Sequence, residues 1–158
     1  MRHDADAYEQ YVGVTLYIVG IATHDGTFKE INNAATHILG YSRGEFLSRP
    51  FFDFVHPDDV ESTKGELVKL EGGLQTFFEN RLRAKGGRYH WISWNAVPYK
   101  GKMYLVGRDV TRVRNDQEKL QIAQARLRLL NQAISDPGRT MWQKIERVLG
   151  LGMKELGL

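Results

Sequence analysis

The chain has 158 residues, of which 42% are hydrophobic and 11% aromatic, and its net charge is +3. This composition can build a core and excludes an intrinsically disordered chain. There is no cysteine, which excludes disulfides, thiolate metal sites and cysteine nucleophiles. No stretch approaches the roughly 18 apolar residues of a membrane-spanning helix, and the polar start lacks a secretory signal. We therefore expect a cytoplasmic location and no membrane partner.

The positive charge lies mainly in the last third of the chain. Residues 1–111 carry 13 Lys/Arg against 14 Asp/Glu, whereas residues 112–158 carry 9 against 5. A basic helix could bind nucleic acid. However, the arginines of residues 112–139 alternate with acids and glutamines, and no aromatic side chains are interleaved with them for stacking on bases. A solvated helix face is the better interpretation, so we predict no nucleic-acid partner.

The first elements are short and separated by turns. Residues 16–23 and 27–31 read as two strands joined by His24-Asp25-Gly26, in which the Asp-Gly pair is typical of a tight hairpin turn. Asn32-Asn33 can cap a short helix that runs through His37, Ile38 and Leu39 and stops at Gly40. Ser42 and Glu45 have the spacing of a capping box, which predicts another short helix.

A longer helix is expected over residues 56–71. His56-Pro57-Asp58-Asp59 places a proline in the first turn and two carboxylates near the positive end of the helix dipole, and Gly72-Gly73 ends the helix. Adjacent carboxylates point about 100° apart on a helix, so they do not converge as an acid/base pair.

Three further strands follow, over residues 77–84, 89–97 and 103–108, with glycine-containing turns between them. In the first of them Phe78, Asn80 and Leu82 alternate with charged residues, which predicts one buried face. Two strands, several short helices and three strands predict an α+β fold. Its five-stranded antiparallel sheet has helices on one face.

From residue 112 the chain reads as a helical linker. Its apolar seam has heptad spacing and contains Val113, Leu120, Ala123, Leu127, Leu130 and Ile134, with Asp116 at one seam position. This pattern is typical of a parallel coiled coil and predicts a homodimer. The alternative is a single helix that packs its stripe on its own domain.

Together these segments resemble a PAS domain with its C-terminal PAC segment, over roughly residues 10–115. The resemblance extends to the PAS domains of bacterial sensor histidine kinases and cyclic-dinucleotide enzymes. It rests on the order and spacing of six segments: His24–Gly26, Glu30–Ala35, Ile38–Ser42, Phe54–Asp59, Gly86–Trp91 and Gly107–Thr111.

The resemblance implies a sensor or relay and no catalyst. Asp109 and Thr111 match the Asp-x-Thr element that ties the last strand to the exit helix in this family. The expected organisation is an N-terminal helical cap (1–15), the PAS/PAC domain (16–111) and the helical linker (112–135). Residues 136–158 then form an end helix or the start of a following domain, which resembles the opening helix of a GAF domain.

The resemblance also allows the cofactor-binding positions of the family to be compared with the residues of this chain. Photoactive flavin relatives need a cysteine, and the positions of their flavin-binding amides and glutamine correspond here to Leu82, Ile92 and Gly107. Haem relatives use a histidine in the long helix before the third strand. Residues 60–71 contain none, and His56 is expected to be a helix-start residue beside Pro57. His90 is more typical of a hydrogen-bonded core residue than of a ligand, and no histidine pair has metal spacing. We expect neither flavin, nor haem, nor metal.

The remaining candidate site is the apolar interior, which either packs without a ligand or holds a small apolar or aromatic molecule. Its expected lining is Ile18, Phe28, Ile38, Leu39, Phe54, Leu82, His90, Ile92, Trp94, Met103, Leu105 and Gly107. Trp91 is opposite in phase to Trp94 and is expected on the outer sheet face, where the N-terminal segment or a second subunit would cover it. The expected dimer contacts are therefore Trp91, Leu120, Leu127, Leu130 and Ile134.

The sequence thus predicts a sensory, relay and dimerisation module of a multidomain bacterial signalling protein. It would pass the state of its core through a coiled coil to a covalently linked output domain. The alternative is a chemosensor that binds a small apolar or aromatic ligand. No constellation of residues indicates an enzyme.

Overall fold

The computed structural model describes residues 16–135, 138, 140, 142–143 and 146. The predicted N-terminal cap over residues 1–15 and most of residues 136–158 lie outside this range, so the GAF-like segment stays a prediction. The chain divides into two units, Met1–Arg112 and Val113–Leu158.

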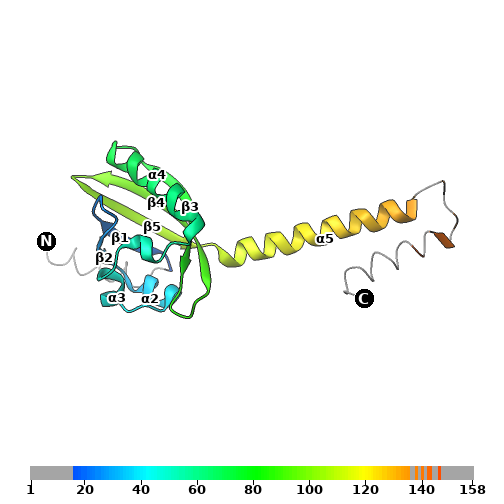
Figure 1. The fold of residues 1–158 in the computed structure, drawn as a ribbon, viewed down its shortest axis with the longest axis horizontal. Coiled ribbons are helices and arrows are strands. Elements are labelled where there is room, and N and C mark those ends of the chain that lie inside the picture. Colours follow the sequence, from blue (N-terminus) through cyan, green and yellow to red (C-terminus); the bar gives the residue numbers. More distant parts are fainter. Residues whose placement is uncertain (1–15, 136–137, 139, 141, 144–145, 147–158) are drawn as a thin grey trace. The chain divides into compact units, whose positions relative to one another are not determined.

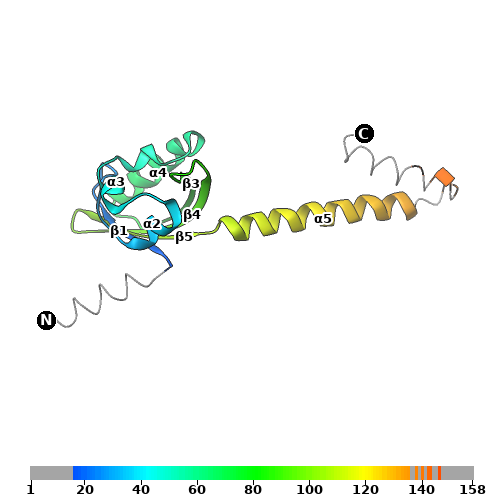
Figure 2. The same cartoon turned by 90° about the horizontal axis from the view of Figure 1, so that it is seen from below.

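The first unit contains a five-stranded antiparallel sheet, as the sequence predicted, and the structure gives its strand order as β2-β1-β5-β4-β3. Its helices α2, α3 and α4 cover one face of the sheet (Figures 1 and 2). The strands are β1 (Ile18–Ala22), β2 (Phe28–Ile31), β3 (Thr76–Arg83), β4 (Tyr89–Tyr99) and β5 (Lys102–Asp109).

The helices of this unit begin and end close to their predicted positions. Gly40 stops α2 in the left-handed conformation, and Ser42 and Glu45 form the predicted capping box at the start of α3. The helices are α2 (Asn33–Leu39), α3 (Arg43–Leu47), the 3₁₀ turns η1 (Phe51–Asp53) and η2 (Pro57–Asp59), and α4 (Val60–Glu71).

Two helix starts differ from the sequence interpretation. Asn32 makes no side-chain cap, because its side chain accepts a hydrogen bond from Val19 N (3.0 Å) and donates one to Tyr17 O (2.8 Å). It therefore ties the start of α2 to the segment that enters β1. The predicted helix over 56–71 begins as η2 and becomes α-helical only at Val60.

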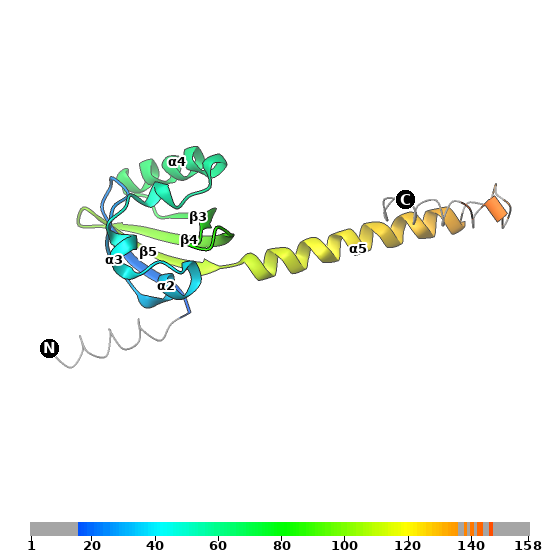
Figure 3. The same cartoon turned by 60° about the horizontal axis from the view of Figure 1, so that its bottom comes forward.

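The edge strand β3 is partly covered by the segment before α4. His56 N donates to Arg81 O (2.8 Å) and Arg83 N donates to Phe54 O (2.7 Å). These bonds satisfy backbone groups that an edge strand otherwise presents to other chains. Figure 3 shows α4 following this segment along the β3 side of the sheet.

Helix α5 (Thr111–Ser135) begins two residues after the last sheet bond of β5 and continues into the second unit. Among the described residues, no helix combines the length and the apolar character that crossing a bilayer requires.

Candidate functional site

The start of α5 is hydrogen-bonded to two strands of the sheet. Asp109 Oδ1 accepts from Thr111 N (2.9 Å), which caps the new helix as the sequence suggested for a short side-chain oxygen. Thr111 Oγ1 has a different role, because it accepts from Trp91 N (2.8 Å) on β4. Val110 N in turn donates to Trp91 O (2.8 Å). Both the backbone N–H and the backbone carbonyl of Trp91 on β4 therefore form hydrogen bonds with residues 110–111, where the chain leaves the domain.

His90 completes this junction. Its Nδ1 lies 2.8 Å from Asp109 Oδ2, and both side chains are partly buried. Burial raises the pKa of Asp109, but hydrogen bonds with Thr111 and His90 outweigh it and hold that pKa below its ordinary value. Because an ionised carboxylate only accepts, the contact requires a proton on His90 Nδ1. His90 is thus a hydrogen-bonded residue of the junction.

A second polar cluster lies beside Trp91 on the outer face of the sheet. The Arg81 guanidinium carbon lies 5.2 Å from the centre of the Trp91 ring, within the range of a cation–π contact. Trp91 is half-buried, and Arg81 on the neighbouring strand β3 supplies part of the cover that a tryptophan on the outer face was expected to need. The predicted role of Trp91 in a dimer stays a prediction.

Asp59 holds Arg81 in this position. Its carboxylate accepts three hydrogen bonds from Arg81, from the backbone N (2.8 Å), Nε (2.9 Å) and Nη2 (2.6 Å). The sequence assigned Asp59 to the helix dipole, whereas its strongest partner is 22 residues away on β3. The side-chain hydrogen bonds of Arg81 keep the pKa of Asp59 below its ordinary 3.8.

This ion pair predicts a specific acid sensitivity. Because the folded-state pKa of Asp59 is depressed, its contribution to stability is fully present above pH 3.8 and is lost as the pH falls below that value. We expect wild-type protein to lose more unfolding free energy between about pH 5 and pH 2 than the Asp59→Asn variant, measured by urea denaturation. Equal losses in the two proteins would show that the pair adds nothing at neutral pH.

The interior contains a buried chain of hydrogen bonds. Trp94 Nε1 donates to Asn80 Oδ1 (2.9 Å), Asn80 Nδ2 donates to Thr63 Oγ1 (3.2 Å), and Thr63 Oγ1 donates to Asp59 O (2.7 Å). Thr63, Asn80 and Trp94 are each at most 1% exposed. These bonds satisfy buried polar groups and join α4 to β3 and β4.

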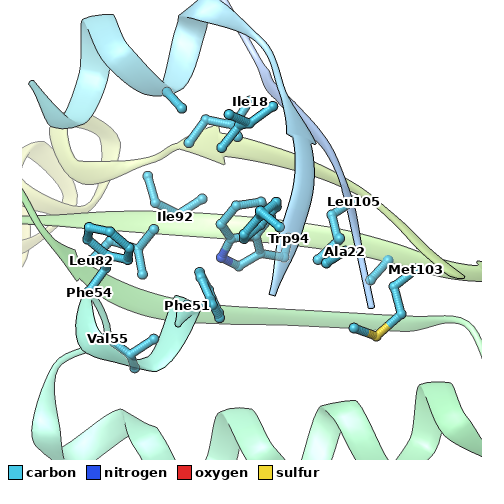
Figure 4. Close-up of a cluster of buried hydrophobic side chains, with 14 of the residues drawn as sticks. Ile18, Ala22, Phe51, Phe54, Val55, Leu82, Ile92, Trp94, Met103 and Leu105 are labelled. Atoms are coloured by element: carbon cyan, nitrogen blue, oxygen red, sulfur yellow. The ribbon is translucent and has the colours of Figure 1, made fainter. Parts of the chain in front are cut away.

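Trp94 lies within the cluster of buried side chains between the sheet and the helices, with Phe51 beside it (Figure 4). The Phe51 ring meets Trp94 edge-on at 5.9 Å, and the Phe46 and Phe54 rings stack at 4.5 Å. Trp94 also lies directly against Gly107, where a Cβ atom would come within 2.6 Å of the indole. At the position that corresponds to the flavin relatives' glutamine, a side chain would collide with Trp94.

The predicted lining residues mostly belong to this core. Ile38 is only partly buried, His90 belongs to the junction, and Gly107 is buried. The other nine are buried: Ile18, Phe28, Leu39, Phe54, Leu82, Ile92, Trp94, Met103 and Leu105.

In the part of the chain that the structure describes, no group of three or more His, Asp or Glu side chains is arranged to hold a metal ion. His56, which stands before the long helix, uses Nδ1 to accept from Asp58 N (3.2 Å). It thereby caps η2, in agreement with its interpretation as a helix-start residue.

The predicted dimer residues of α5 are open to solvent in the single chain. Leu120 is 59% exposed, Leu127 60% and Ile134 55%, and Leu130 is intermediate. These side chains are available for an intermolecular contact.

Several residues of the site were missed from the sequence. Asn80 was recognised as inward-facing, and a buried amide within an apolar alternation is a signal of a hydrogen-bond network. Nothing in the local sequence pairs Asp59 with Arg81, because the partner lies on another element. Phe46 lies in the short helix α3 and Phe51 in the 3₁₀ turn η1; both elements are too short to show a periodic apolar pattern, so these residues were not assigned to the core.

Comparison with known proteins places this geometry in a family. A family profile described as the PAS fold matches residues 28–108. Over 78 residues the chain is 31% identical to the aryl hydrocarbon receptor nuclear translocator homolog of Drosophila melanogaster. That match covers 48% of this chain and 12% of the relative, so the chain spans a small part of that protein.

Solved structures agree on the fold. A domain of a sensory box sensor histidine kinase/response regulator from Geobacter sulfurreducens has a TM-score of 0.60 at 22% identity, over 68% of this chain and 96% of that chain. The PAS domain of an HTR-like protein from Haloarcula marismortui has a TM-score of 0.62 at 18% identity, over 69% and 99%.

Proposed function

Since the chain belongs to the PAS family, we propose that it is a sensory relay and dimerisation domain that passes the state of its core into α5. The observation that carries this proposal is the junction at Thr111. The first residue of the exit helix is hydrogen-bonded to β4 through Trp91 and to β5 through Asp109. A change in the relative position of these strands therefore acts directly on the start of the helix.

The output would lie outside this chain, in a linked domain of a bacterial signalling protein such as a histidine kinase or a cyclic-dinucleotide enzyme. The resemblance and the sensor-kinase structural neighbour support this proposal. The chain itself would be sensory and not catalytic. A cytoplasmic location stays a prediction.

We further propose that the domain works without flavin, haem or metal. Trp94 packs against Phe51 and Phe78 in the interior, and its indole lies against Gly107. The stacked rings of Phe46 and Phe54 are also buried there. Such a core transmits strain through packing, because close-packed side chains cannot rearrange independently.

The dimer would be parallel and formed by the seam of α5. Exposed leucines at heptad positions support this arrangement, since burying them between two helices removes apolar surface from water.

The relay role predicts that Asp109→Ala and Thr111→Ala change the stimulus response of the full-length signalling protein, while the isolated domain still folds. Loss of the Asp109 cap should cost about 0.5–2 kcal/mol of stability. Output activity across the stimulus range and thermal unfolding of the domain are the two measurements.

Thr111→Ser is the matched control, because it keeps a hydroxyl that can accept from Trp91 N. It should retain the wild-type response. If both alanine variants signal like wild type, these are ordinary helix-start residues and the relay proposal is refuted.

A further inference from the structure

We propose that Arg81 is a positioning residue that couples the first turn of α4 to the exit helix. The coupling runs from Asp59 through Arg81 and Trp91 to Thr111. Its biological meaning rests on the relay function proposed above, whereas its existence can be measured on this chain alone.

The first step fixes Asp59 to α4. Its carbonyl oxygen accepts from Ser62 Oγ (2.9 Å) and from Thr63 Oγ1 (2.7 Å), both in the first turn of the helix. Its side chain is only 14% exposed and is directed to β3. A shift of the α4 start therefore moves the carboxylate that holds Arg81.

The second step passes from Arg81 to Trp91. The guanidinium forms hydrogen bonds to Asp59 through Nε and Nη2 and places its carbon 5.2 Å from the Trp91 ring centre. A planar guanidinium can make both contacts at once, whereas the point charge of a lysine ammonium cannot reproduce the fork and the stack together. Arg81 and Trp91 are also direct cross-strand partners of β3 and β4.

The third step passes from Trp91 to α5. Its backbone N donates to Thr111 Oγ1 and its carbonyl accepts from Val110 N, both at 2.8 Å. The position of Trp91 on β4 thus sets two of the bonds that hold the helix start. In the proposed coupling the start of α5 has two states, one in which these two hydrogen bonds are formed and one in which they are broken.

A second chain of hydrogen bonds, inside the core, connects the same turn of α4 to Trp94. Thr63, which anchors Asp59, is also bonded to Asn80, and Asn80 to Trp94, at the centre of the core. Repacking around Trp94 therefore reaches the same first turn of α4 that holds Arg81.

The test is amide hydrogen exchange, measured by NMR on the 158-residue chain. In Arg81→Lys, the amides of Trp91 and Val110 should exchange at least about fivefold faster, the lower end of typical coupling between sites. The amide of Leu105, on the central strand β5, reports global unfolding and should be unchanged. Arg83→Lys is the matched control, two residues further on the same strand, and should leave all three rates unchanged.

If Arg81→Lys destabilises the whole domain, faster amide exchange no longer reports the coupling alone, and a reciprocal measurement tests it instead. Coupling is symmetric, so Thr111→Val should raise the pKa of Asp59 toward its ordinary value, as followed by carboxyl NMR titration. A role of Arg81 confined to local stability would leave that pKa unchanged.

Wild-type exchange at Trp91 and Val110 in Arg81→Lys, or an unchanged Asp59 pKa in Thr111→Val, overturns the proposal. The relay function fails separately, if Asp109 and Thr111 variants signal normally while the exchange and pKa effects are present.

Discussion

Replacing Trp94 with alanine should lower the free energy of unfolding by about 3–5 kcal/mol, the usual cost of removing a fully buried aromatic side chain. Trp94 is 1% exposed and lies against Phe51, Phe78 and Gly107. Its removal leaves a cavity and deprives Asn80 Oδ1 of its donor. Urea denaturation followed by circular dichroism measures the change.

Two further variants separate the causes. Trp94→Phe keeps most of the ring but leaves Asn80 Oδ1 unsatisfied, which should cost about 1–3 kcal/mol. Trp142→Ala is the matched control, because Trp142 is 76% exposed, and its effect should fall within about 0.5 kcal/mol. If Trp94→Ala destabilises no more than Trp142→Ala, Trp94 does not organise the core.

The second large effect concerns self-association. The double variant Leu120→Ala/Leu127→Ala should weaken the dimer strongly, because each well-buried leucine truncated to alanine costs about 2–5 kcal/mol. Because these residues are exposed in the single chain, truncating them should reduce the free energy of association and leave the unfolding free energy of the sheet domain unchanged. Sedimentation equilibrium of wild-type and variant protein measures it.

Helix α5 supplies its own control. Ile122 and Leu129 each follow a seam leucine by two residues, which places them about 200° around the helix. Ile122→Ala/Leu129→Ala removes a similar amount of exposed apolar surface and should leave dimerisation unchanged. An equal effect of both double variants, or none from the leucine pair, would show that the seam is not the interface.

Much of the fold could be predicted because its signals are local. The Ser42/Glu45 capping box involves residues three apart, and the stop of α2 at Gly40 needs only a residue that tolerates a positive φ angle. Alternation along β3 and β4 identified the inward-facing Leu82, Ile92 and Trp94. Each of these features is fixed by neighbours within a few residues.

The rest of the site depends on contacts between distant elements. Asn32 looked like a helix cap but bonds the backbone around β1, and Asp59 looked like a dipole residue but binds Arg81. In both cases a side chain that could serve its own helix found a partner 13 to 22 residues away. Only the folded sheet brings these partners together, so sequence patterns could not reveal them.

The central proposal, that α5 carries the signal as a helix orientation, has one direct test in the full-length protein. Duplicating residues 120–126 adds seven residues and keeps the seam within about 20° of its original phase, whereas a two-residue insertion at the same place rotates everything beyond it by about 200°. We predict that the heptad duplication retains stimulus-dependent output and that the two-residue insertion abolishes or inverts it. Equal output from the two insertions would contradict transmission through α5.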